Sequence, residues 1–234
     1  VLTEVPQITP FVADFARVVR DAGFTVALPD LLGTAGRPAT VGDVAGAFAH
    51  VCVSKEFTVF ARGRSSPIIE WLRPLGRELH ARAGGPGIGA IGMCLTGGFA
   101  LALAVDDHLL APVLSQPSLP AGPWNARDLG LPRVDLERVK QRCATEDLCV
   151  LGLRFEGDLL APKGRFARLR EEFGEHFIGI ELPDDVAHPG NRPVPPHSVV
   201  TTDLIDEPGH PTFEAREQVL ELFRERLEIG RAHV

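Results

Sequence analysis

The sequence lacks three features that would point to a membrane or a nucleic acid as its partner. No stretch approaches the roughly 20 uninterrupted apolar residues of a membrane span. The 234 residues include 31 acidic and 24 basic side chains, so the net charge of −7 repels both a phosphate backbone and anionic lipid. The first residues do not show the basic and apolar regions of a signal peptide. We therefore expect a cytoplasmic protein with neither nucleic acid nor membrane as a partner.

Cysteine is also sparse, and its spacing excludes the common metal motifs. The four cysteines are scattered along the chain, without the pairing of a metal site or a disulfide framework: Cys52, Cys94, Cys143 and Cys149. We interpret all four as free thiols, and we expect neither a metal nor an organic cofactor.

The sequence does contain a regular alternation of apolar runs and amphipathic segments. Predicted strands cover residues 1–5, 24–30, 87–93, 108–114, 147–155, 176–182 and 197–205. Predicted helices cover residues 9–22, 41–50, 66–82, 96–105, 135–143, 162–174 and 211–227. Such alternation is typical of an α/β fold, a mostly parallel sheet with helices on both faces. The length and the 44% hydrophobic content favour a single domain over residues 1–234.

Active sites of parallel sheets collect where the strands end at their carboxyl edge. The polar or reactive residues just after the predicted apolar runs are Glu4, Asp30, Cys94, Gln116, Asp158 and His210. Among them, Cys94, Asp158 and His210 follow the chain order nucleophile, acid, base of α/β-hydrolases. A thiol becomes a useful nucleophile when an imidazole takes its proton and a carboxylate holds that imidazole in the right tautomer.

The segment "IGMCLTGGFA", residues 91–100, has the form of a nucleophile turn between a strand and a helix. Gly92 allows a turn sharp enough to lift the Cys94 sulfur above the sheet. The backbone amide of Leu95 lies at the helix start, where it can stabilise an oxyanion. The other interpretation is that Cys94 is a small buried thiol with no chemistry.

Four segments together resemble the dienelactone hydrolase family, α/β-hydrolases with a cysteine nucleophile: "LTEVPQI", "GMCLTGG", "FEGDLLAP" and "EPGHPTF". The resemblance implies an α/β-hydrolase-like fold, with Cys94 as nucleophile, Asp158 as acid and His210 as base. It also implies that Glu4 contacts the resting thiol. The amides of Val5 and Leu95 would form the oxyanion hole.

The chain departs from the family pattern at several points. Thr96 occupies the position of a glycine two residues after the cysteine, and Glu214 stands where an arginine should follow the histidine. Arg62 and Arg64 are weak candidates for binding a substrate carboxylate. The first strands of the family are absent from the chain as given, so we expect an open edge beside the strand of Glu4, or a longer natural protein.

Alternatives remain for the base and for the function. His197 competes with His210, but it lies at the start of the predicted strand 197–205 and should therefore be at the wrong end of the sheet. Asp158 could instead cap a following helix. We expect a hydrolase of small esters or lactones, a monomer or homodimer, that works through a thioester on Cys94. The alternative is a non-catalytic or redox-responsive protein of the same fold with Cys94 as a sensor thiol.

Overall fold

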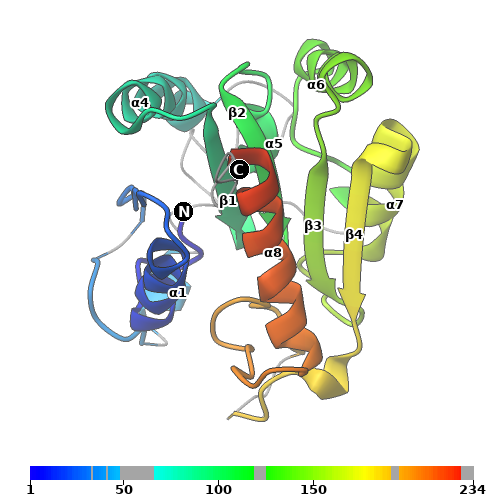
Figure 1. Cartoon of the computed structure of the whole chain (residues 1–234). Helices are drawn as coiled ribbons and strands as arrows, with labels where there is room; N and C mark the ends of the chain where they lie inside the picture. Colours follow the sequence, from blue (N-terminus) through cyan, green and yellow to red (C-terminus); the bar gives the residue numbers. More distant parts are fainter. Residues whose placement is uncertain (33, 41, 48–65, 119–124, 191–194, 228–234) are drawn as a thin grey trace.

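The centre of the protein is a four-stranded, fully parallel sheet (Figure 1). The computed structural model describes residues 1–32, 34–40, 42–47, 66–118, 125–190 and 195–227. The strands pair in chain order: β1 (Ile88–Met93), β2 (Leu109–Ser115), β3 (Val150–Phe155) and β4 (Phe177–Leu182). Helices separate successive strands, so the predicted α/β class, a parallel sheet covered by helices, is confirmed.

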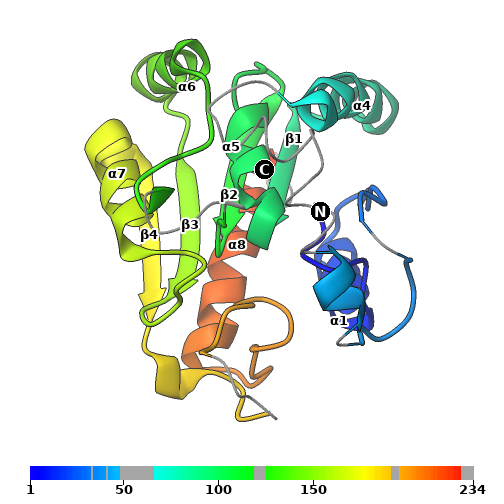
Figure 2. The ribbon, with the colours of Figure 1, turned by 180° about the vertical axis from the view of Figure 1, so that it is seen from behind.

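Helices cover both faces of the sheet, which creates two apolar clusters. One cluster joins the sheet to α4 (Pro67–Ala83), α5 (Gly97–Leu103), α6 (Arg133–Glu146) and α7 (Lys163–Phe173) (Figure 2). The other joins it to α1 (Pro10–Asp21) and α8 (Pro211–Leu227). Neighbouring residues of β1 alternate between them, since Ala90 belongs to the first cluster and Ile91 to the second.

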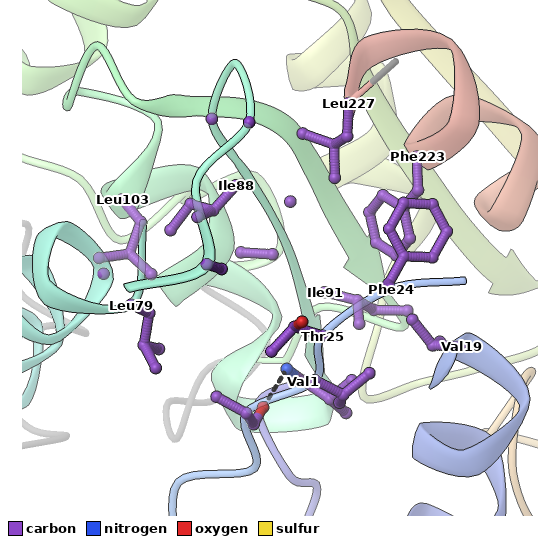
Figure 3. A pocket seen from close by; sticks show the side chains of 18 of the residues that line it. Val1, Val19, Phe24, Thr25, Leu79, Ile88, Ile91, Leu103, Phe223 and Leu227 are labelled. Carbon is purple, nitrogen blue, oxygen red and sulfur yellow. Dashed lines mark hydrogen bonds between the residues drawn. The ribbon is translucent and has the colours of Figure 1, made fainter. Parts of the chain in front are cut away.

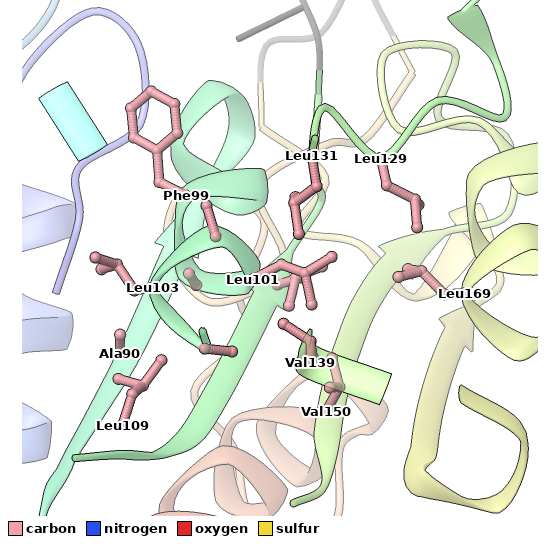
Figure 4. Close-up of a cluster of buried hydrophobic side chains, with 14 of the residues drawn as sticks. Ala90, Phe99, Leu101, Leu103, Leu109, Leu129, Leu131, Val139, Val150 and Leu169 are labelled. Carbon is pink, nitrogen blue, oxygen red and sulfur yellow. The ribbon is translucent and has the colours of Figure 1, made fainter. Parts of the chain in front are cut away.

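Helix α5 is buried on every side, as its continuous apolar sequence predicts. Side chains from α5, β2, α6 and β3 meet in the first cluster, where Leu101 and Val139 are completely buried (Figure 4). Because α5 directly follows the turn that carries Cys94, this packing fixes the base of the candidate site.

Three predicted strands are absent or reduced. Residues 24–30 are irregular, and the first segment contributes only one isolated bridge, from Leu2 to Gly92 of β1. Residues 199–203, inside the predicted strand 197–205, form turns. Apolar composition alone predicted these strands, but a strand also needs a partner along its edge. Among the described residues, only the first segment has such a partner, at the Leu2–Gly92 bridge. The predicted helix 41–50 is present where it is described, over residues 42–47.

An apolar groove of about 350 Å³ lies beside the outer edge of β1 (Figure 3). Its walls come from residues 23–29, α4, β1 and the end of α8, with Leu79, Ile88 and Phe223 among the lining side chains. The backbone nitrogen of Val1 donates a hydrogen bond across it to the Ala27 carbonyl, at 2.9 Å.

Among the helices that the structure describes, none combines the length and the apolar character needed to cross a bilayer.

Candidate active site

Cys94 lies on a sharp turn between β1 and α5, in a backbone conformation that side chains rarely adopt. Its φ angle is +56°, and residues Cys94–Thr96 form a short 3-10 turn. A Cβ atom on Gly92 would overlap the carbonyl oxygen of Thr96, so only glycine fits there. A Cβ on Gly97 would come within 2.6 Å of the Pro117 Cα atom. Such strain at a single reactive residue is typical of functional sites.

Thr96, the residue that departs from the family glycine, ties this turn to the first segment of the chain. Its hydroxyl accepts the Met93 amide at 2.9 Å. The same hydroxyl lies 3.1 Å from the Leu2 carbonyl and 3.0 Å from the Thr3 carbonyl, either of which can accept its proton. The threonine is completely buried. It therefore fixes residues 2–4 against the turn of the nucleophile.

Asp158 follows β3 and lies at the same edge of the sheet as Cys94. Its side chain is buried, and its Oδ1 atom accepts the amides of Leu160 at 2.9 Å and Ala161 at 3.2 Å. Its Oδ2 atom lies 2.7 Å from Nδ1 of His197. Asp158 thus holds its own loop and also binds an imidazole. It does not cap the following helix, as the alternative interpretation proposed, because the N-cap residue of α7 is Pro162.

Arg154 holds the loop of Asp158 in place from inside the sheet. This arginine of β3 is 2% exposed, which is feasible because all of its nitrogens have partners. It donates to the Ala161 carbonyl at 2.7 Å, to the Glu156 carbonyl at 2.8 Å and to the Glu181 carboxylate at 2.5 Å. The sequence offered no local signal for this role, because the contacts arise only in the folded loop.

His197 is the imidazole that faces Asp158 and Cys94. Burial lowers the pKa of His197, but the negative charge that Cys94 carries when it is ionised and the hydrogen bond with Asp158 together raise that pKa well above its ordinary value of 6.5. The Nε2 atom is buried and makes no well-aligned hydrogen bond with the residues that the structure describes. A buried nitrogen of this kind, beside a thiol, is placed to exchange a proton with it.

The prediction of His210 as the base is corrected by this geometry. The Nδ1 atom of His210 lies 2.9 Å from the Thr212 hydroxyl, and the His210 carbonyl accepts the Glu214 amide as α8 begins. His210 is therefore a helix-start residue, and among its described contacts none is with Cys94 or Asp158. The error came from the predicted strand 197–205: because residues 199–203 form turns, His197 is free to approach the carboxyl edge.

Glu4 is buried at this edge, but its described contacts are with residues other than the thiol. The carboxylate accepts hydrogen bonds from Gln116, Ser198 and Thr201, at 3.0, 2.8 and 2.6 Å. The sequence placed Glu4 and Gln116 at strand ends, and the structure brings both together. The described hydrogen bonds of Glu4 do not include the expected contact with Cys94.

Of the two candidate oxyanion amides, that of Leu95 directly follows Cys94 in the chain. Leu95 is the second residue of the 3-10 turn, where an amide has no acceptor within the helix. Val5 packs against the apolar cluster that contains both Cys94 and Leu95. Arg62 and Arg64, the weak candidates for carboxylate binding, lie outside the described residues.

The described part of the chain contains no cluster of three or more His, Cys, Asp or Glu side chains that could hold a metal ion. Comparison with known proteins adds no assignment, since no family model matches the chain and no curated protein matches it significantly.

Proposed function

We propose that this protein hydrolyses small esters or lactones through Cys94, His197 and Asp158, as an α/β-hydrolase of the dienelactone hydrolase type. The observation that carries the proposal is the His197 ring, hydrogen-bonded through Nδ1 to Asp158 at 2.7 Å and raised in pKa by Cys94. The strained turn that contains Cys94 also supports the proposal, because it presents the sulfur at the start of a helix.

Acylation would begin with transfer of the Cys94 proton to Nε2 of His197. The sulfur then attacks the substrate carbonyl carbon, and the carbonyl oxygen takes the electron pair as an oxyanion. The amides of Leu95 and Val5 are the donors we assign to this oxyanion. Collapse of the intermediate breaks the ester C–O bond, the leaving oxygen takes the proton from His197, and a thioester remains on Cys94.

Deacylation would use water and the same imidazole. His197 takes a proton from water as the oxygen attacks the thioester, and returns it to the sulfur when the C–S bond breaks. The products are a carboxylic acid and the free thiol. Asp158 holds Nδ1 throughout, so that Nε2 remains the nitrogen that exchanges protons.

A panel of p-nitrophenyl esters and enol lactones tests the proposal, with the two histidines as a matched pair. We expect Cys94→Ala to abolish turnover and His197→Asn to lower kcat about 10²- to 10⁴-fold, because the proton acceptor is lost. His210→Asn should keep turnover close to that of the wild type. The proposal is wrong if His210→Asn loses activity while His197→Asn retains it.

Asp158 gives a second test, because its two oxygens have separate roles. Asp158→Asn keeps an acceptor for the amides of Leu160 and Ala161 but loses the charge that orients His197. Turnover should fall by orders of magnitude, with the fold retained by circular dichroism. Full activity in this variant would mean that Asp158 only holds its own loop, by accepting the amides of Leu160 and Ala161.

Thiol labelling separates the enzyme from the redox-sensor alternative. Iodoacetamide should label Cys94 rapidly at neutral pH and leave Cys143 and Cys149 unlabelled. Burial raises the pKa of Cys143 to about 11 and also raises the pKa of Cys149. A Cys52→Ala background removes the fourth thiol. Labelling that abolishes turnover supports the hydrolase, whereas rapid labelling with no turnover on any ester or lactone favours the sensor.

A further inference from the structure

The loop that carries His197, residues 197–203, contains no regular secondary structure that would fix the imidazole. Part of its order is internal: the Asp203 carboxylate accepts the amides of His197 at 2.6 Å and Ser198 at 2.9 Å. These bonds set the shape of the loop. They do not set its position relative to Cys94, which lies on a different element.

Glu4 connects this loop to the first segment of the chain, in addition to the His197–Asp158 hydrogen bond and the burial of Val199 and Val200. One carboxylate oxygen accepts the hydroxyl of Thr201, and the other accepts the hydroxyl of Ser198 and the side-chain amide of Gln116. The glutamate is 4% exposed. A buried carboxylate is costly unless its oxygens are hydrogen-bonded, so these donors and Glu4 hold each other in place.

The backbone on the other side of Glu4 is attached to the turn of the nucleophile. Leu2 pairs with Gly92 of β1, and its amide donates to the Ile91 carbonyl at 2.8 Å. The Thr96 hydroxyl lies against the carbonyls of Leu2 and Thr3. A continuous set of hydrogen bonds therefore runs from the turn of Cys94, through residues 2–4, to the loop of His197.

We infer that Glu4 is a positioning residue that fixes the His197 loop against the turn of Cys94, acting through Ser198 and Thr201. The inference rests on the proposed function, in which His197 must reach the Cys94 sulfur. It differs from the thiol contact implied by the family resemblance, because both Glu4 oxygens already accept hydrogen bonds from the loop or from Gln116. Misplacing a catalytic group by about 1 Å costs roughly 100-fold in rate, so such a connection has a measurable effect.

The test compares two neighbouring threonines of the same loop. Thr201→Val removes the hydroxyl that binds Glu4 and keeps the shape of the side chain, whereas Thr202→Val changes an exposed residue. We expect Thr201→Val to lower kcat about tenfold or more with little change in KM, and to slow iodoacetamide labelling of Cys94 at neutral pH. Glu4→Gln should also lower kcat and slow the labelling of Cys94. The double variant with Thr201→Val should show little further loss, because both substitutions disrupt the same connection between Glu4 and the His197 loop.

The titration of His197, followed by its ring proton signals in NMR, reports the same connection without any substrate. The titratable or charged groups that act on this ring are Cys94 and Asp158. Thr201→Val should bring the His197 pKa towards its ordinary value, and Thr202→Val should leave it raised.

The possible outcomes separate the two proposals. Faster labelling of Cys94 in Glu4→Gln, or equal behaviour of Thr201→Val and Thr202→Val in the titration, overturns the positioning role. A wild-type protein that turns over no ester or lactone overturns the proposed function. In that case the NMR titration still decides whether Glu4 positions the loop.

Discussion

At the scale of single residues, His197 links the stability of the protein to pH. Burial disfavours its charged form, but Cys94 and Asp158 favour that form more strongly, so the pKa in the folded protein is well above 6.5. A group whose pKa rises on folding stabilises the fold fully below its unfolded pKa. That contribution is lost as pH rises through the folded pKa.

We predict that the free energy of unfolding of the wild type, relative to His197→Gln, is greatest below pH 6.5 and declines as the solution becomes alkaline. Urea titrations of both proteins at a series of pH values measure this difference. His210→Gln is the control, because His210 contacts Thr212 at a helix start. A difference that stays constant across this range contradicts the raised pKa.

Residue positions at strand ends could be predicted from the sequence, but loop geometry could not. Glu4, Cys94, Gln116 and Asp158 each follow a predicted apolar run, and the structure brings them to one edge of the sheet. His197 was misplaced because "HSVVTTDLI" has the β-branched composition of a strand. It forms a loop because the amides of His197 and Ser198 donate hydrogen bonds to the Asp203 carboxylate, and the pattern of apolar residues does not indicate such side-chain contacts.

At the scale of elements, the connection from β1 to α5 depends on the close approach of backbone to backbone. We predict that Gly92→Ala destabilises the protein by about 3 kcal/mol or more, because the added methyl group overlaps the Thr96 carbonyl and neither backbone can yield without opening the turn. Thermal unfolding followed by circular dichroism measures the loss.

A second glycine provides the control for this substitution. Gly46 lies in the helical segment 42–47, and a methyl group there would meet no atom within 4 Å. Gly46→Ala should leave stability unchanged or raise it slightly, because alanine restricts the unfolded chain. Equal effects at Gly46 and Gly92 would mean that the turn at Cys94 is not tightly packed.

The order of helices and strands from β1 to α7 followed from the sequence, because each strand there has a neighbour in the sheet. The segment 24–30 has an equally apolar sequence, yet it lies at the groove beyond β1 and forms no ladder. Periodicity indicates which residues prefer burial, and it does not indicate whether a hydrogen-bonding edge is available.

At the scale of the whole molecule, the groove beside β1 is an apolar surface separate from the candidate active site. We predict that a fluorescent apolar dye, anilinonaphthalene sulfonate, binds there to the folded protein. Leu79→Glu should weaken this binding because Leu79 lines the groove. Trp71→Glu, a change to a half-exposed residue of the same helix outside the lining, should preserve it. Equal loss in both variants would place the dye elsewhere.

Hydrogen bonds from different residues hold the backbone around each member of the candidate triad. Thr96 holds the turn of Cys94, Arg154 holds the loop of Asp158, and Glu4 and Asp203 hold the loop of His197. Apolar burial also holds the two loops, because Ala161 beside Asp158 is completely buried and Val199 and Val200 of the His197 loop belong to the apolar cluster that includes α1 and α8. Parts of a protein with few apolar contacts open at lower free energy than the core, and these loops do not belong to that class. On warming, we therefore expect the catalytic arrangement and the fold to be lost together.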